Sequence, residues 1–237
     1  MTRRGFSLLL AAAGDDWRSA FDGKTFAGWR DPSMLEPAGD SWRIEDGCFA
    51  TNPNPSLLED LESVADYMDF EFSFDWKIEA GGNSGVKYSI AQRIFFENEK
   101  PGWAQGKRVP DRSFKAGTRG QQYLSACEFQ LIEDSELWGP MQRTGSLYGL
   151  AAPDKPAGAK TGEWHSGLLK KHGMDVEHWI NGNKLLSVKL DSPEIEEALK
   201  KNPGRLAAHK ASLSFRSTIA LQNHGGSRAW FQNLKIK

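Results

Sequence analysis

The chain has 237 residues and a formal net charge of −1, with 39% hydrophobic residues and 24 glycines. This length fits one large β domain or two small ones, and the composition is that of a turn-rich globular protein. The near-zero charge gives no electrostatic reason to expect nucleic acid or an anionic membrane surface as a partner, and no segment is long and apolar enough to span a bilayer. The two cysteines, Cys48 and Cys127, lie in strand-like runs far apart in the sequence, which favours buried free thiols over a disulfide.

The first residues resemble an export signal. Arg3 and Arg4 precede an apolar run over positions 8–13 that ends in three small residues, Ala11 to Ala13. Because paired arginines before such a run resemble a twin-arginine signal, we expect residues 1–16 to direct export to the periplasm or the extracellular space. The run is short, and a hydrophobic N-terminal extension without a targeting role is the alternative. Residues 17–237 contain neither a repeat nor a linker and are predicted to form one domain.

Most of the chain reads as short strands joined by turns. Asp46-Gly47 and Asn181-Gly182 each stand between two alternating runs, which predicts a hairpin at both places. The cleanest strand is residues 69–78, in which aromatic and polar side chains alternate. The pattern breaks from about residue 93 to residue 123, where glycines, basic residues and a proline predict a long excursion, either a functional rim or a flexible insertion.

One segment, residues 193–201, is predicted to be helical. Ser192 is a favourable N-cap, Pro193 suits the first helical position, and glutamates precede lysines along the segment. Asn202-Pro203-Gly204 is predicted to end the helix. Many short strands with one short helix indicate an all-β sandwich or jelly roll.

Residues 125–134 organise this sandwich, because their apolar and polar side chains alternate strictly. As a strand, this segment sends Glu128 and Gln130 to one face, and we expect Lys87 beside them on a concave polar surface. An ordinary solvated strand face is the alternative. The opposite face is predicted to be buried between the sheets with the residues Phe70, Phe72, Phe74, Trp76, Phe129, Leu131 and Leu221.

Nine short motifs, taken in order, are similar to those of the 3-keto-disaccharide hydrolase domain family. They are Phe21-Asp22-Gly23-Lys24 with Gly28-Trp29, Trp42 with Asp46-Gly47, Asp69 to Phe72, Gly82 to Tyr88, Glu128-Phe129-Gln130 with Asp134, Gly145 to Tyr148, Gly162-Glu163-Trp164, Val176 to Gly182, and Leu221 to Gly225. The chain departs from the family pattern at His165, Ala126 and Ser89, where asparagine, glycine and, in some members, arginine are usual.

The resemblance implies a concanavalin-like jelly-roll fold and the cleavage of glycosides already oxidised to a ketone at sugar C3. A C3 carbonyl acidifies the C2 proton, so a base can remove it and the group on C1 can leave by elimination. Water adding to the product completes a net hydrolysis. Such a site needs a base, an acid for the leaving oxygen and a positive charge near the developing enolate. The expected partner is therefore a small-molecule carbohydrate, a 3-keto-glycoside.

Candidate residues for these roles follow from strand parity and from the motifs. We expect Glu128 or His178 as the base, with Lys87 or a divalent metal ion polarising the carbonyl. The residues expected to hold the sugar are Asn83, Gln130, Tyr148, Trp164, Gln222 and His224, with Trp164 stacking on the ring. The residues that could bind the metal are Glu128, Asp134, His178 and His224, although their spacing matches no recognised metal motif. Each of them also has an ordinary structural reading as a packed or solvated strand residue.

Two other functions remain open from the sequence. A laminarinase-like retaining glycosidase would use Glu128 and Glu133 if a bulge rotated Glu133 onto the face of Glu128. Asp134 cannot serve in its place, because six extended residues separate it from Glu128 by about 20 Å. A noncatalytic carbohydrate-binding module is the other alternative, favoured by the nine tryptophans.

Overall fold

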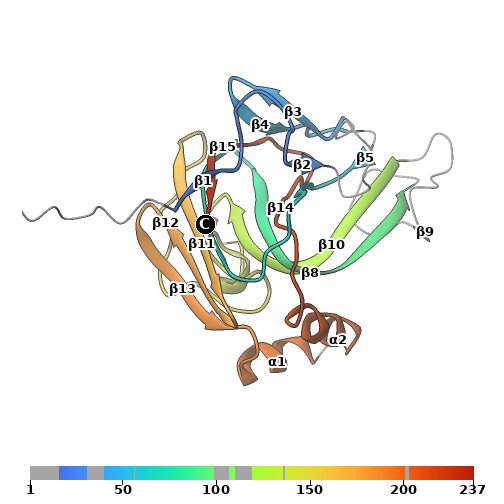
Figure 1. The fold of residues 1–237 in the computed structure, drawn as a ribbon, viewed down its shortest axis with the longest axis vertical. Helices are drawn as coiled ribbons and strands as arrows, with labels where there is room; N and C mark the ends of the chain where they lie inside the picture. The colour runs from blue at the N-terminus through green and yellow to red at the C-terminus, as the bar shows by residue number, and fades with distance from the viewer. Residues whose placement is uncertain are drawn as a thin grey trace, which may run out of the picture.

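A computed structural model of the chain describes residues 16–30, 40–55, 57–98, 107–109, 119–135, 137–200 and 203–237. It is a sandwich of two mostly antiparallel sheets, with two short helices below them in Figure 1. The all-β jelly-roll prediction is thereby confirmed. Residues 1–15, which carry most of the predicted export signal, lie outside the described residues. No helix among the described residues is long and apolar enough to cross a membrane.

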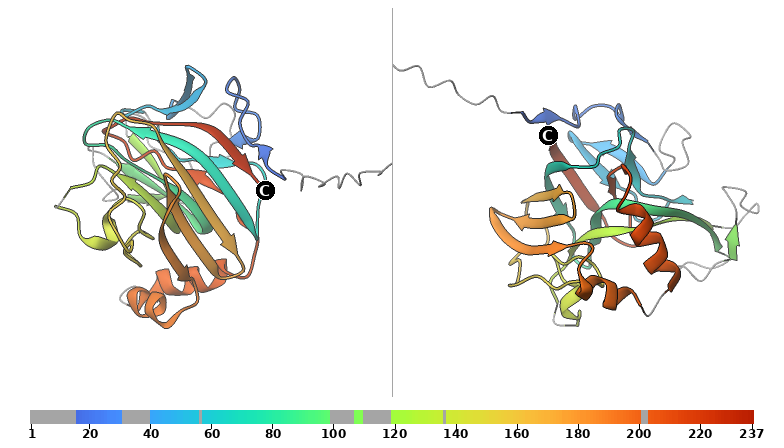
Figure 2. Two further views of the ribbon diagram at one scale, coloured as in Figure 1. Left: turned by 90° about the vertical axis from the view of Figure 1, so that its left-hand side faces the viewer. Right: turned by 60° about the horizontal axis from the view of Figure 1, so that its bottom comes forward.

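The first sheet, called sheet A here, faces the viewer in the left panel of Figure 2. Its strands run in the order β13 (Asn183–Lys189), β12 (Asp175–Ile180), β11 (His165–His172), β7 (Phe70–Ile78), β15 (Ala229–Ile236), β4 (Cys48–Thr51) and β3 (Trp42–Glu45), with β1 (Arg18–Ser19) also paired to β15.

The second sheet, called sheet B, contains the central strand predicted from the sequence. Its strands run in the order β2 (Trp29–Arg30), β6 (Leu61–Ser63), β14 (Ala220–Leu221), β8 (Asn83–Asn98), β10 (Arg119–Ile132) and β5 (Leu57–Leu58), with β9 (Lys107–Val109) paired to β8. The long strands β8 and β10 curve together across the molecule (Figure 1).

The core lies between the two sheets and contains the residues that alternation predicted. Along β7, every second residue from Phe70 to Ile78 is buried, because a strand sends alternate side chains to opposite faces. No larger residue fits in place of Gly167 on the neighbouring strand β11, since a Cβ there would lie 2.4 Å from the ring of Phe74. The predicted core residues are at most 3% exposed, namely Phe70, Phe72, Phe74, Trp76, Phe129, Leu131 and Leu221. Cys48 and Cys127 are buried free thiols, as predicted.

Both predicted hairpins are present. Asp46 and Gly47 have φ values of 49° and 77°, and Asn181 and Gly182 have values of 50° and 73°. Two successive residues with positive φ give a two-residue turn whose twist matches that of the flanking strands. Asn, Asp and Gly tolerate this conformation, so these dipeptides set the registers of β3–β4 and β12–β13.

The sequence predicted an irregular segment from residue 93 to residue 123, but both ends of this segment are strands. Strand β8 continues to Asn98 and β10 begins at Arg119, while residues 99–106 and 110–118 lie outside the described residues. The pairing of β8 with β10 shifts between Ser125 and Cys127, and Ser89 has a φ of 48°. These irregularities interrupt the alternation of apolar and polar side chains. The outer halves of both strands therefore lack the pattern from which a strand is predicted.

The helical prediction is right for one helix and misses another. Helix α1 (Pro193–Leu199) begins after Ser192, whose side chain accepts a hydrogen bond from the Ile195 amide. The segment expected to end the helical region instead begins α2 (Pro203–Ser212). Proline is favoured in the first turn of a helix, where its missing N–H is not needed, so Pro203 starts this helix rather than ending the one before.

Candidate functional site

One row of side chains crosses sheet B on the face turned away from sheet A, called the polar face here. Glu128 on β10 lies opposite Lys87 on β8, and Lys87 lies opposite Ala220 on β14. On the other side of β10, the Tyr148 amide donates to the Glu128 carbonyl over 3.0 Å. The segment 143–148 is also joined to β10 by two backbone hydrogen bonds of Gln130 and by an isolated bridge between Phe129 and Leu147. Tyr148, Glu128 and Lys87 are therefore cross-strand neighbours, and the tyrosine is 37% exposed.

A second row of the polar face lies next to the first. The Gln222 amide donates to the Gly85 carbonyl over 2.9 Å, and Gly85 pairs with Gln130. The Gln130 side-chain amide donates to Asn83 Oδ1 over 2.8 Å. Gly85 has no side chain, and a Cβ at this position would lie 2.8 Å from Glu128 Oε1. The glutamate carboxyl group thus occupies the space above this glycine, between the side chains of Gln130 and Gln222.

A buried ion pair stands beside Glu128. Lys87 Nζ lies 2.8 Å from Asp60 Oδ2, and both side chains are only 3% exposed. Asp60 also accepts a hydrogen bond of 3.1 Å from the Asn223 amide. Burial disfavours the charged form of Lys87, but the carboxylates of Asp60 and Glu128 outweigh it and raise the pKa of the ammonium group. Lys87 therefore carries a fixed positive charge at the polar face.

The carboxyl group of Glu128 can change its protonation state near neutral pH. Burial raises its pKa from the ordinary 4.5 to about 7, and the Asp60 carboxylate acts in the same direction. The charge of Lys87 and a side-chain hydrogen bond with Gln222 oppose this rise. A carboxyl group poised in this range is suited to accept and return protons at physiological pH.

His224 and Gln222 lie near the same ion pair. Burial, with the nearby charge of Lys87, lowers the pKa of His224 to about 4, so its ring is neutral at pH 7. Gln222 is 4% exposed, and its Oε1 atom accepts no hydrogen bond from the described part of the chain. A buried amide oxygen without a partner is a good position for a ligand hydroxyl group.

The structure does not bring His178 to this face. The side chain is fully buried between the sheets, where its ring stacks on Phe129 with centroids 4.1 Å apart. Its two nitrogens lie 3.0 Å from the Tyr88 hydroxyl and 3.0 Å from the Gly145 carbonyl. Burial lowers its pKa to about 3. The expectation that His178 shares a face with Glu128 is wrong, because β12 sends its even-numbered residues from Val176 to Ile180 into the core.

Trp164 also lies elsewhere. Strand β11 pairs His165 with Trp76, which is in the core, so the preceding residue stands on the outward face of sheet A. The Trp164 ring lies there beside Lys77, 4.9 Å from the ammonium nitrogen. The two outward faces of a sandwich point in opposite directions, so Trp164 is not part of the polar face around Glu128.

The four predicted metal ligands are not gathered in one place. His178 is in the core, and Asp134 is an exposed residue beyond the end of β10. No group of three or more His, Cys, Asp or Glu side chains among the described residues could hold a metal ion. Glu128 and His224 remain near the Lys87–Asp60 pair, where a lysine ammonium group already supplies positive charge.

The carboxylate pair required for a laminarinase-like site is not formed either. Glu133 accepts a hydrogen bond of 2.8 Å from the Gly81 amide at the turn between β7 and β8. The irregularity in the β8–β10 pairing lies before Cys127, and the register from Cys127 to Ile132 is continuous. No bulge therefore rotates Glu133 onto the face of Glu128.

Sequence reasoning missed Asp60 and its neighbour Glu62. Glu62 is fully buried on β6 and is bound by the Arg93 guanidinium group and the Thr218 hydroxyl. The alternation of apolar and polar residues does not mark either carboxylate as part of a site, since all three residues of β6 are buried. Their partners are also distant in sequence, since Asp60 and Lys87 are 27 positions apart.

Fold and site together define a β-sandwich protein of the concanavalin-like class, with a lysine and a titrating glutamate on one sheet. The model of the 3-keto-α-glucoside-1,2-lyase-like domain matches residues 16–237, and the chain belongs to this family. A 3-keto-disaccharide hydrolase from Bacteroides thetaiotaomicron is 28% identical over 255 residues, which cover 98% of this chain and 81% of the relative.

Solved structures agree with this assignment. The crystal structure of a candidate glycosyl hydrolase from Parabacteroides distasonis has a TM-score of 0.69 and 27% identity, with 93% of each chain covered. A second candidate glycosyl hydrolase from the same organism has a TM-score of 0.61 and 22% identity. The alignment covers 94% of this chain and 99% of that structure, and it shows the shared fold. Together with the family, the Bacteroides relative and the first of these two structures support a carbohydrate-active function.

Proposed function

We propose that the protein cleaves 3-keto-glycosides by removing the C2 proton and eliminating the C1 substituent, with net hydrolysis. The observation that carries this proposal is the pairing of Glu128, whose pKa is about 7, with the protonated Lys87 across one strand boundary. A base and a fixed positive charge are the two groups that formation of an enolate requires.

In this mechanism the Glu128 carboxylate removes the proton from C2, and the electrons of that bond move toward the C3 carbonyl oxygen. The positive charge of Lys87 stabilises the enolate that forms, and Asp60 holds the ammonium group in place over 2.8 Å. When the enolate collapses, the bond from C1 to the leaving oxygen breaks. The proton on Glu128 is then available for the departing oxygen.

Water completes the reaction by adding across the double bond between C1 and C2. Its hydroxyl group joins C1 and a proton returns to C2, so the products are the 3-keto sugar and the released alcohol or sugar. The groups we assign to holding sugar hydroxyls are Tyr148, Gln130, Asn83, Gln222 and His224. The unpartnered Oε1 of Gln222 and the neutral ring of His224 both suit this task.

The test is a comparison of a 3-keto-glucoside with its unoxidised parent glucoside, each with and without chelator. We expect rapid cleavage of the ketone alone, because the C2 proton of the parent is not acidic. A substrate deuterated at C2 should show a primary kinetic isotope effect on kcat/KM. Equal turnover of both glucosides, or cleavage of the ketone without an isotope effect while chemistry limits the rate, would contradict the mechanism.

Addition of a chelator distinguishes Lys87 from a divalent metal ion as the source of positive charge near the C3 carbonyl. If Lys87 supplies it, activity survives chelation. Loss of activity on chelation that is restored by a divalent cation would assign the carbonyl to a metal ion instead.

A further inference from the structure

A row of two tryptophans and a lysine crosses the outward face of sheet A. Trp230 on β15 pairs with Lys77 on β7, and Trp164 stands on the other side of Lys77. The Lys77 nitrogen lies 4.7 Å from the Trp230 ring centroid and 4.9 Å from the Trp164 ring centroid. These three residues are called the Trp–Lys–Trp row. The proposed mechanism does not use them.

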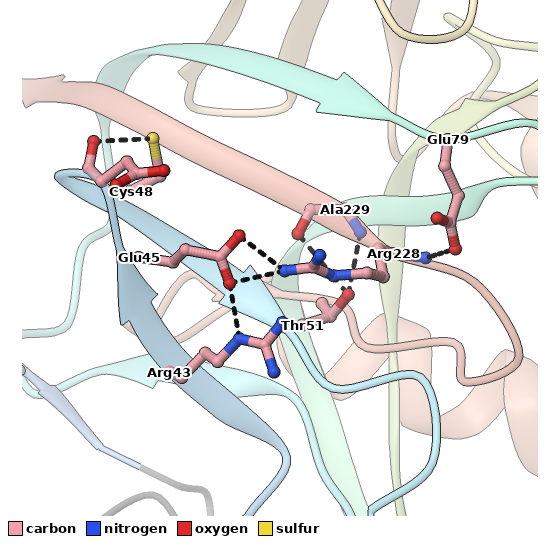
Figure 3. A network of polar contacts seen from close by, with 8 residues as sticks. Arg43, Glu45, Cys48, Thr51, Glu79, Arg228 and Ala229 are labelled. Carbon is pink, nitrogen blue, oxygen red and sulfur yellow. Dashed lines mark hydrogen bonds and ion pairs between the residues drawn. The ribbon is translucent and has the colours of Figure 1, made fainter.

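Neighbouring side chains hold one end of this row in a fixed position. Both carboxylate oxygens of Glu45 accept hydrogen bonds from Arg228, over 2.8 and 2.7 Å, as Figure 3 shows. The Arg228 guanidinium group lies 4.5 Å from the Trp230 ring centroid, and Glu45 also has a side-chain hydrogen bond with Trp230. Because the ring is fixed at its face and at its edge, little conformational entropy remains to be lost when a ligand binds.

The other end of the row is accessible. Trp164 is 39% exposed. Lys77 forms no ion pair with a carboxylate among the described residues, so the hydrogen-bond donors of its ammonium group are directed to the two rings or to solvent. The row therefore presents an open indole ring next to a cation that has not been neutralised.

We infer that the Trp–Lys–Trp row is a second carbohydrate-binding site, at which a pyranose ring stacks on Trp164 and accepts hydrogen bonds from Lys77. The C–H face of a pyranose matches an aromatic ring, and its hydroxyl and ring oxygens match an ammonium donor beside that ring. The row lies on the opposite outward face of the sandwich from Glu128. A saccharide chain can therefore be held here without occupying the polar face.

The chemistry of the surroundings favours a sugar over a protein partner. Protein interfaces have an apolar centre that is depleted of charged residues and cover roughly 800 Å² on each partner. Here Lys77 lies between the two indole rings, and Arg228 and Glu45 border Trp230, so charged groups interrupt the apolar surface on both sides of that ring. A single stacked sugar fits this pattern.

Affinity electrophoresis of the Glu128→Gln variant tests the inference, because this variant removes the proposed base and so prevents turnover of a substrate. The probes are dextran, laminarin and pectin, each cast in a native gel. We expect retardation by at least one of them. Trp164→Ala in the same background should weaken the interaction by about fivefold or more, and Lys77→Met should weaken it as well.

Trp179 provides a matched control on the same face. It is a partly buried tryptophan near Lys170 and Lys184, but these lysines are ion-paired, Lys184 with Glu177 over 2.9 Å and Lys170 with Glu71 over 3.6 Å. Trp179→Ala should leave the retardation unchanged. Thermal melts establish that each variant is folded.

Three results would overturn the inference. One is the absence of retardation by all three polysaccharides, and another is retardation that persists in a folded Trp164→Ala variant. The third is gel filtration showing that Trp164 mediates self-association, because the row would then be a contact between two copies of the chain.

Discussion

Replacement of Glu128 by glutamine should inactivate the protein and at the same time stabilise it at neutral pH. Glutamine keeps the shape of the side chain but cannot accept the C2 proton. Loss of a positioned base lowers kcat by roughly 10² to 10⁴. The stability effect has a separate origin, the cost of keeping an ionised carboxyl group at this partly buried position.

The sign of the stability effect follows from the pKa. Burial raises the pKa of Glu128 from 4.5 to about 7, so the folded state binds the proton more tightly than the unfolded state. The cost of ionisation is absent below pH 4.5, grows as the pH rises and is complete above pH 7. At 1.36 kcal/mol per pKa unit, the full cost is up to about 3 kcal/mol. Glu128→Gln should therefore match the parent near pH 4.5 and exceed it by up to that amount at pH 8.

Urea unfolding at pH 4.5, 6 and 8, followed by tryptophan fluorescence, measures this difference. Glu133→Gln is the matched control, since Glu133 lies on the same segment but accepts a hydrogen bond from the Gly81 amide. It should destabilise the protein. The reasoning is refuted if the stability gain of Glu128→Gln does not grow with pH, or if a folded Glu128→Gln variant retains full activity.

Three further predictions concern neighbouring residues. In the parent, kcat/KM should fall as the pH drops through about 7, where Glu128 becomes protonated. Lys87→Met should move this fall to higher pH, because the lysine charge lowers the pKa of Glu128. A fall at the same pH in the variant would show that Lys87 does not influence the ionisation of Glu128. His178→Ala should lower the free energy of unfolding by about 2–4 kcal/mol, since it opens a cavity and leaves Tyr88 without its partner. Activity per folded molecule should stay within a few fold, and its loss without a change in melting temperature would return His178 to the mechanism. Gly85→Ala should lower kcat by about tenfold to a hundredfold with the fold intact, because its Cβ would displace the Glu128 carboxyl group; normal kinetics would show that this position of the carboxyl is not required.

Features that depend on neighbours in sequence were predictable. The alternation of β7 and the Asp46-Gly47 and Asn181-Gly182 turns act over a few residues, and the structure has them where the sequence places them. The same local rule would have located His178 correctly, because it alternates with Val176 and Ile180, which are both buried. The motif around His178 suggested a site residue, whereas the alternation along its own strand places the side chain in the core.

Features that depend on distant pairing were not predictable. Asp60 reaches Lys87 only because β14 pairs with β6 on one side and with β8 on the other. That order joins segments near residues 60, 87 and 220, and no periodicity in the sequence encodes it. The polar face could thus be identified from Glu128, Gln130 and Lys87, whereas the carboxylate that fixes the lysine could not.

The position of β15 has a consequence for synthesis of the chain. This strand follows all other described elements in the sequence, yet it lies inside sheet A between β7 and β4 and also pairs with β1, the first of them. Strand β15 is synthesised after β7 and β4, so these two strands cannot be joined until β15 has emerged from the ribosome. Until then each exposes an unpaired edge that can bind other chains. A nonsense mutation before residue 229 would remove β15 and leave both edges permanently open, so aggregation is expected rather than a shortened active protein.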